Sequence, residues 1–178
     1  QPVSGKSFPR TGGGHILFGE GEPFLSRQLA VTYIHLDKWQ GAMPEGKSNL
    51  LPKTSAKLQN KEVLKIVYYG DSISAGCNSS GFQKVEPFAD DWPTMVTEYL
   101  KNMYQNESIT MVNASVGGKN SNWALSNVAN VAGLKPDLVV IGFGMNDGTA
   151  LIPANVYANN ISSIMNKILA ENENCEFI

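Results

Sequence analysis

The sequence predicts an α/β fold in which a parallel sheet lies between two helical layers, preceded by a small β-rich segment. From residue 63 onward, short apolar runs alternate with stretches whose apolar residues recur at helical spacing. Run 137–143 is almost entirely apolar, which is typical of a strand buried on both faces. Upstream, the chain is rich in glycine and aromatic residues and shows no long helical period. We therefore divide the chain into residues 1–62 and residues 63–178.

Residues 1–62 are expected to hold part of a β-rich module and a linker. Stretches 15–18 and 29–34 alternate as short strands do. Residues 43–62 contain prolines, a glycine, a serine and several lysines, which is typical of a connector.

Residues 63–178 are expected to alternate strands and helices. We expect strands at 63–69, 109–112, 137–143 and 175–178. Helices are expected between them, at 121–131 and from Pro153 onward, after a first helix that begins near Trp92. The chain stops within the last strand, so we expect the domain to be truncated here and to continue beyond Ile178. The apolar stripe expected to bury the first helix comprises Trp92, Met95, Val96, Tyr99, Leu100 and Met103.

Charge and composition narrow the class of protein. The net charge is −2, from 14 basic and 16 acidic residues, and gives no electrostatic case for a nucleic acid or an anionic membrane as partner. No apolar stretch reaches transmembrane length. Cys77 and Cys175 lack metal-site spacing, so we expect one half-buried thiol and one core thiol, with a single disulfide as the alternative. The chain begins at Gln1 rather than methionine, so we expect that a preceding segment has been removed.

The motif Gly70-Asp71-Ser72-Ile73-Ser74 ends the first of these strands. Glycine permits a sharp turn, and the turn exposes the serine hydroxyl at the carboxyl edge of the sheet, where open α/β folds bind ligands. Such a turn is one way to present a serine nucleophile. The alternative is that Ser72 only caps a helix or a turn.

Two further loops follow the next two strands. Loop 113–120 contains Gly117 and Gly118, and loop 142–148 contains Asn146. Because the carboxyl ends of parallel strands share one edge, a hydroxyl, a backbone N–H and a side-chain amide can converge there. Such N–H donors stabilise the oxyanion of an acyl-transfer reaction. Either Gly117 or Gly118 can supply the backbone N–H. Alternatively, the glycines and Asn146 only form turns.

These three motifs resemble, in the right order, three of the four sequence blocks of the SGNH (GDSL) hydrolases. The resemblance covers residues 63–178 and implies a flavodoxin-like three-layer sandwich. It implies that Ser72 is the nucleophile of a serine ester hydrolase that forms an acyl-enzyme. The Ser72 N–H, the Gly118 N–H and the Asn146 amide would then form the oxyanion hole. No cofactor and no metal are implied.

The fourth block of that family, Asp-x-x-His, is absent from this sequence. The resemblance therefore implies that the catalytic histidine and aspartate are not in this chain, and that this stretch alone has very weak activity or none. The two histidines, His15 and His35, lie upstream and are expected to be packing or surface residues. Asp71 and Asp147 are expected to be structural hydrogen-bonding residues.

A looser resemblance, over residues 31–35, 39–41 and 51–54, is to bacterial secreted carbohydrate esterases that carry a β module before the hydrolase domain. It implies a secreted or periplasmic enzyme that deacetylates a polysaccharide or a similar short-chain ester. Trp123 is the expected substrate wall; Trp39 and Trp92 are other tryptophans that could line a sugar site, although Trp92 fits the helix stripe and is expected in the core. The alternatives are a lipase or thioesterase of the same family, and a non-catalytic binding protein on the same fold.

Overall fold

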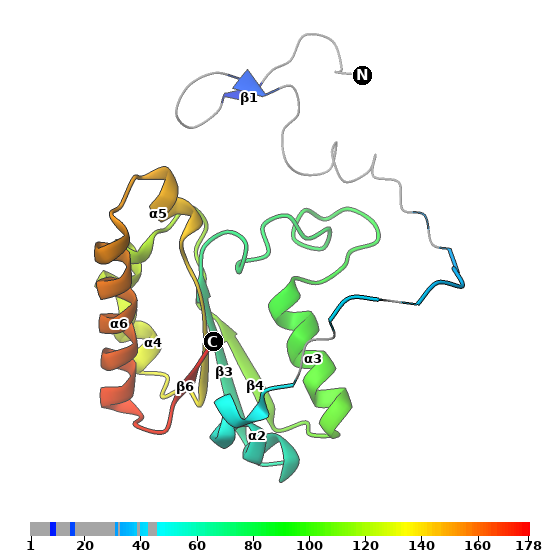
Figure 1. Ribbon diagram of the computed structural model, residues 1–178. Helices are drawn as coiled ribbons and strands as arrows, with labels where there is room; N and C mark the ends of the chain where they lie inside the picture. Colours follow the sequence, from blue (N-terminus) through cyan, green and yellow to red (C-terminus); the bar gives the residue numbers. More distant parts are fainter. Residues whose placement is uncertain (1–7, 10–14, 17–30, 32, 39, 43–45) are drawn as a thin grey trace. The chain divides into compact units, whose positions relative to one another are not determined.

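The computed structural model describes residues 8–9, 15–16, 31, 33–38, 40–42 and 46–178 (Figure 1). The chain divides into two compact units, and each is described by itself. One comprises Gln1–Gly46 and Asn78–Ala89, and the other comprises Lys47–Cys77 and Asp90–Ile178. The division that the sequence predicts at residue 62 stays a prediction.

The first unit contains a short antiparallel hairpin. Its strands are β1 (Phe8–Pro9) and β2 (His15–Ile16), so the strand expected at 15–18 is present over its first two residues, and its remainder lies outside the described residues. Of the strand expected at 29–34, the described residues Val31, Tyr33 and Ile34 belong to no strand. The other three lie outside the described residues.

The second unit is built on a four-stranded parallel sheet (Figure 1). Its strands are β3 (Leu64–Gly70), β4 (Ile109–Asn113), β5 (Leu138–Gly142) and β6 (Glu176–Phe177), in the order β4-β3-β5-β6. All four lie where the sequence predicts them. The chain passes from β3 to β4 on one side and then to β5 on the other side of β3. In open parallel sheets such a reversal marks the usual ligand site, at the carboxyl ends of the strands.

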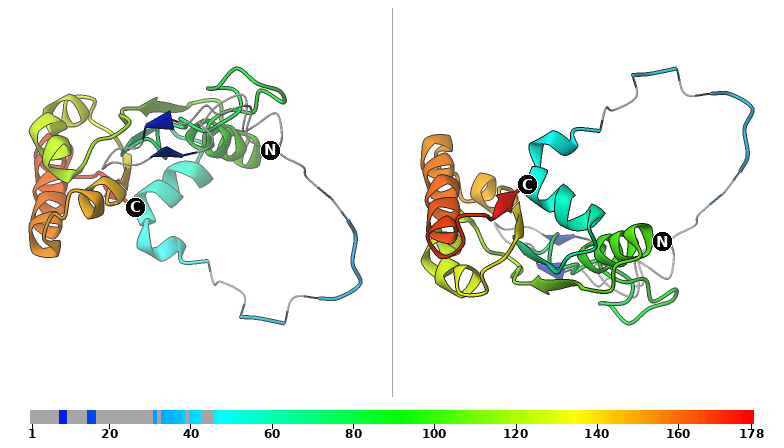
Figure 2. Two further views of the ribbon diagram at one scale, coloured as in Figure 1. Left: turned by 90° about the horizontal axis from the view of Figure 1, so that it is seen from above. Right: turned by 90° about the horizontal axis from the view of Figure 1, so that it is seen from below.

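Helices cover both faces of this sheet, which confirms the predicted three-layer α/β fold (Figure 2). Helices α4 (Ser121–Ala132) and α6 (Ala154–Glu171) pack on one face, against Val67 and Tyr69 of β3. Helices α2 (Pro52–Gln59) and α3 (Trp92–Tyr104) lie on the other face, over Ile66 and Tyr68. Alternate residues of one strand thus face two different cores. Cys175 is buried as a core thiol, and burial raises its pKa to about 12, whereas Cys77 is half-buried.

Helix α3 lies where the sequence predicts it, but the prediction that its apolar stripe is buried is wrong. Thr97 takes the place against the sheet, where its hydroxyl donates to the Pro93 carbonyl at 2.8 Å and shares a hydrogen bond of 3.1 Å with the Tyr68 hydroxyl. Because hydrogen bonds satisfy this buried hydroxyl, a polar residue can hold a core position. Leu100 is half-buried against the sheet. The stripe residues that are at least a third exposed are Trp92, Met95, Val96, Tyr99 and Met103.

Part of the expected connector is instead helix α2. The backbone N–H groups of Lys53 and Thr54, in its first turn, donate to the carboxylate of Glu176 at 2.9 and 2.7 Å. Burial acts to raise the pKa of Glu176, but hydrogen bonding with Thr54 and Lys53, together with the charge of Lys53, outweighs it and holds the pKa below its usual value. Thr54 and Leu58, one helical turn apart, are the buried residues of α2. Because a carboxylate of β6 binds its first turn, α2 cannot be recognised from its local composition alone.

Candidate active site

Ser72 lies in the turn directly after β3, at the carboxyl edge of the sheet. The Asp71 carboxylate accepts a hydrogen bond from the Ile73 N–H at 3.0 Å, which spans Ser72. The Ser72 carbonyl accepts from the Cys77 N–H at 3.1 Å. These two bonds define the backbone on both sides of the serine, and the Ser72 side chain remains half-buried.

Two glycines make room for this turn. Gly70 and Gly142 are paired at the ends of β3 and β5, and the buried Ser74 folds back against both. A Cβ atom on Gly70 would lie 2.5 Å from Ser74 Oγ and 2.7 Å from the Gly142 carbonyl oxygen. Sequence reasoning did not single out the packing of Ser74. The available signal was a glycine at the end of each of two neighbouring strands.

Replacing Gly70 with alanine is expected to destabilise the fold by about 1–3 kcal/mol, because backbone must move to admit the new methyl group. The Gly148→Ala variant is the matched control, since a Cβ there meets nothing within 4 Å. Urea unfolding of both variants measures the difference. Equal stability of the two variants would contradict this account of the turn.

The loop after β4 passes beside Ser72. The Val116 N–H donates to the Gly70 carbonyl at 2.9 Å and so continues the β3–β4 pairing into the loop. A Cβ atom on Gly117 would lie 3.6 Å from the Cβ of Ser72, so this stretch of backbone is adjacent to the serine. Gly118 is exposed and has a φ of +74°, which favours glycine. That the Gly118 N–H, and not the Gly117 N–H, faces a substrate stays a prediction.

The loop after β5 leads into a short helix, α5 (Met145–Thr149), which the sequence did not predict. The Asn146 amide nitrogen donates to the Asp71 carboxylate at 3.2 Å and to the Lys119 carbonyl at 2.9 Å. Asp71 precedes Ser72, and Lys119 follows Gly118. The amide therefore joins all three loops at one edge of the sheet, next to the residues that the motifs single out.

Two tryptophans of this unit lie near these loops. Trp123 is half-buried on α4, with its ring 6.2 Å from that of Tyr69 and 5.6 Å from the Lys119 ammonium nitrogen. Its role as a substrate wall stays a prediction. Trp92 was expected in the core, but it is 36% exposed and its indole N–H donates to the Ile73 carbonyl at 3.0 Å. It thus connects α3 to the Ser72 turn. Trp39 lies outside the described residues.

The two histidines belong to the other compact unit. His35 is exposed, with its ring 6.1 Å from that of Tyr33, and His15 lies in β2. Residues 47–178 contain no histidine. No residue of the unit that carries Ser72 can therefore supply an imidazole.

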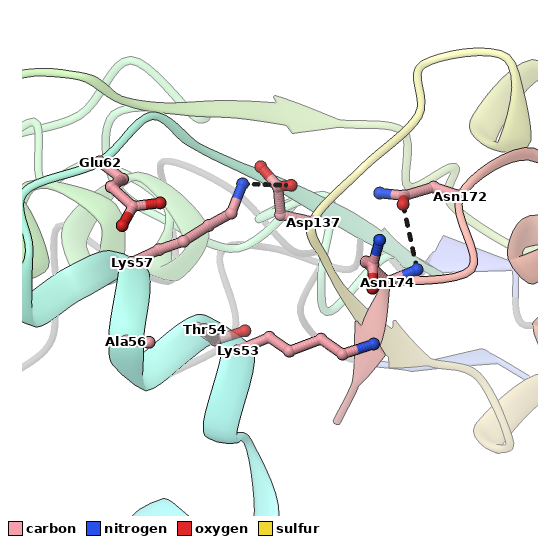
Figure 3. Close-up of a pocket in the computed structure, with 8 residues that line it drawn as sticks. All are labelled: Lys53, Thr54, Ala56, Lys57, Glu62, Asp137, Asn172 and Asn174. Atoms are coloured by element: carbon pink, nitrogen blue, oxygen red, sulfur yellow. Dashed lines mark hydrogen bonds and ion pairs between the residues drawn. The ribbon is translucent and has the colours of Figure 1, made fainter.

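A cavity of about 380 Å³ lies at the opposite, amino edge of the sheet (Figure 3). Asp137, which directly precedes β5, pairs there with Lys57 at 2.7 Å, and Asn172 accepts from the Asn174 N–H at 3.1 Å. None of its lining residues belongs to the Ser72 turn. The cavity is lined by Lys53, Thr54, Ala56, Lys57, Glu62, Asp137, Asn172 and Asn174.

Neither a metal cluster nor a membrane-spanning helix occurs in the described part of the chain. Among the described residues, no three or more histidine, cysteine, aspartate or glutamate side chains are grouped so that they could hold a metal ion. None of the helices described is both long enough and apolar enough to span a membrane.

Comparison with known proteins finds similarity over the unit that carries these loops. Residues 68–178 match the GDSL-like Lipase/Acylhydrolase family. An arylesterase of Vibrio mimicus is 29% identical over 105 residues, which cover 58% of this chain and 48% of that protein. The crystal structure of TesA is 28% identical with a TM-score of 0.50, and the match covers 64% of this chain and 57% of TesA.

A third similarity is one of fold alone. The crystal structure of a two-domain esterase (CEX) active on acetylated mannans is 22% identical with a TM-score of 0.58, and the match covers 74% of this chain and 33% of that protein. The chain thus spans about half the length of the arylesterase and of TesA, and a third of the length of CEX.

Proposed function

Since this chain belongs to the GDSL-like lipase/acylhydrolase family, we propose that the protein is a serine ester hydrolase whose nucleophile is Ser72. The observation that carries the proposal is the meeting of three loops at one sheet edge. A Cβ atom added to Gly117 would lie 3.6 Å from the Cβ of Ser72. The Asn146 amide donates a hydrogen bond to Asp71, the residue before Ser72. The Ser72 hydroxyl and these candidate N–H donors thus share one edge of the sheet, which supports acyl transfer as the reaction.

The proposed reaction has two stages. The Ser72 hydroxyl attacks the ester carbonyl and its proton passes to a base, which then protonates the departing alcohol as the acyl–oxygen bond breaks. Water, activated by the same base, hydrolyses the acyl-enzyme and releases the acid. Because the chain holds no Asp-x-x-His block and residues 47–178 contain no histidine, we propose that the base is a histidine, oriented by an aspartate, that lies outside this chain.

The proposed oxyanion hole consists of the Ser72 N–H, the Gly118 N–H and the Asn146 amide. Both hydrogens of that amide already have acceptors, Asp71 at 3.2 Å and the Lys119 carbonyl at 2.9 Å. We propose that the oxyanion replaces Asp71 as acceptor, because that bond is the longer of the two. The bond to Lys119 then keeps the amide oriented during the reaction.

For the substrate, we propose a short acyl group, acetyl above all, on a polysaccharide or a similar alcohol. The looser resemblance of residues 31–54 to secreted carbohydrate esterases supports this choice. CEX, a protein of the same fold, is active on acetylated mannans. The proposal implies an enzyme that acts outside the cytoplasm, with Trp123 as a wall of the sugar site.

The acyl-chain profile tests this choice of substrate. Hydrolysis of p-nitrophenyl esters by the protein as its gene encodes it is expected to be fastest for acetate and to fall steadily as the acyl chain lengthens. A preference for long chains, or for thioesters over oxygen esters, would instead support a lipase or thioesterase of this family. Absence of turnover on every ester would support a binding protein on the same fold.

A further inference from the structure

We infer that Asp147 is a positioning residue: through Ser121, it holds the second and third loops at a defined spacing and so places the donors on Gly118 and Asn146. The inference rests on the proposed function. Asp147 is adjacent to Asn146 in α5, and Ser121 begins α4, three residues after Gly118. Their contact therefore joins the two loops next to one proposed donor and three residues from the other.

The contact between Asp147 and Ser121 is buried and multiple. The two carboxylate oxygens of Asp147 accept from the Ser121 N–H at 3.0 and 3.1 Å, and one of them also accepts from the Ser121 hydroxyl. Asp147 is 3% exposed and Ser121 is fully buried. Hydrogen bonds to an acidic side chain in such surroundings are stronger than those at the surface. The pair is thus a firm connection between α5 and the start of α4.

Asn160 of α6 completes this network. Its amide nitrogen donates to the Ser121 hydroxyl oxygen at 2.9 Å and to the Asn122 side-chain oxygen at 2.7 Å. The Ser121 hydroxyl thus donates to Asp147 and accepts from Asn160, so its orientation is determined from both sides. A fully satisfied buried network favours one arrangement of the elements that it joins.

Asn146 and Asp147 connect the same two loops in different ways. The Asn146 amide lies at the site, and in the proposed mechanism it exchanges one partner for the oxyanion. The Asp147–Ser121 contact is buried and takes no part in that exchange. It can therefore keep Gly118 and Asn146 at their spacing while the reaction proceeds. A displacement of about 1 Å in such donors can reduce the rate about 10²-fold.

The Asp147→Asn variant tests this role, because it keeps the shape but places an NH₂ group against the Ser121 N–H. For p-nitrophenyl acetate we expect kcat to fall about 10- to 100-fold while KM changes by less than about threefold. Asn127→Ala is the matched control: it removes a half-buried amide of α4 that donates to the Trp123 carbonyl at 2.8 Å and lies outside the network of Asp147, Ser121 and Asn160. It is expected to lower the unfolding temperature and leave kcat unchanged.

A second readout does not depend on turnover. The ¹H–¹⁵N resonances of the Gly118 N–H and of the Asn146 side chain are expected to shift in Asp147→Asn and to stay in place in Asn127→Ala. If Asp147→Asn does not fold, Ser121→Ala is the second variant: it removes the hydroxyl bonds to Asp147 and from Asn160 but keeps the backbone N–H bonds to Asp147. It is expected to shift the same resonances and to lower kcat severalfold.

Each outcome separates this inference from the proposed function. An unchanged kcat and unchanged resonances in Asp147→Asn would overturn the inference, as would equal losses of kcat in Asp147→Asn and Asn127→Ala. Persistent activity in a Ser72→Ala variant would overturn the proposed function, whereas the resonance shifts would still decide whether Asp147 positions the loops.

Discussion

Replacing Ser72 with alanine is expected to lower ester hydrolysis by at least about 10³-fold, because no acyl-enzyme can form without the hydroxyl. Ser72 is half-buried. In its turn, the Ile73 N–H donates to the Asp71 carboxylate and the Cys77 N–H donates to the Ser72 carbonyl, so neither hydrogen bond uses the serine hydroxyl. The fold is therefore expected to remain intact. Initial rates with p-nitrophenyl acetate, measured beside thermal unfolding curves, check both expectations.

The matched control for this variant is Ser126→Ala. Ser126 lies exposed on α4, and its hydroxyl donates to the Asn122 carbonyl within the same helix at 3.0 Å. Its loss is expected to change neither rate nor stability appreciably. If Ser72→Ala were as active as Ser126→Ala, Ser72 would not be the nucleophile.

Replacing Asn146 with alanine is expected to lower kcat about 10²- to 10³-fold, equivalent to about 3–4 kcal/mol of transition-state stabilisation, which is the usual effect of removing one oxyanion donor. KM is expected to change little, because this bond forms with charge that develops only in the transition state. Steady-state kinetics on an acetate ester separates the two parameters. The substitution also removes the bonds from the amide to Asp71 and to the Lys119 carbonyl.

Asn127→Ala controls for the loss of a structural amide. The Asn127 amide nitrogen donates to the Trp123 carbonyl within α4 at 2.8 Å, and its side chain is likewise half-buried. Its removal is expected to cost some stability at unchanged kcat. A rise in KM at constant kcat in Asn146→Ala would show that Asn146 binds substrate without stabilising the oxyanion.

The sheet could be predicted from sequence because its central strands are covered on both faces. Val67 and Tyr69 face one core, and Ile66 and Tyr68 face the other, so β3 is apolar from Ile66 to Tyr69 without alternation. Because parallel strands end at a common edge, the sequence also predicts that the loops of Ser72, Gly118 and Asn146 meet there.

The helical faces were harder to predict. Periodicity placed the buried face of α3 on its apolar stripe, but the residue against the sheet is Thr97, which periodicity cannot recognise because its hydroxyl is satisfied by Pro93 and Tyr68. Helix α2 carries only one large buried apolar side chain, Leu58, and its first turn is bonded to Glu176, 122 residues away from Thr54.

The polar interior of the site could not be predicted either. Asp147 and Ser121 are 26 residues apart in sequence, and neither belongs to an apolar period that would place it inside. Glycine motifs predicted where the loops lie. They do not predict which of the Gly117 and Gly118 N–H groups acts as donor, because that choice depends on the orientation of a single peptide.

The central claim is that Ser72 is the nucleophile of an ester hydrolase, and covalent labelling tests it most directly. The protein as its gene encodes it would be incubated with a fluorophosphonate, digested and mapped by mass spectrometry, with Ser72→Ala beside it. The account predicts one adduct, on the peptide that contains Ser72, formed in step with the loss of esterase activity and absent from the variant. Ester hydrolysis that persists without an adduct on Ser72, or an adduct on another residue that abolishes it, would contradict the account.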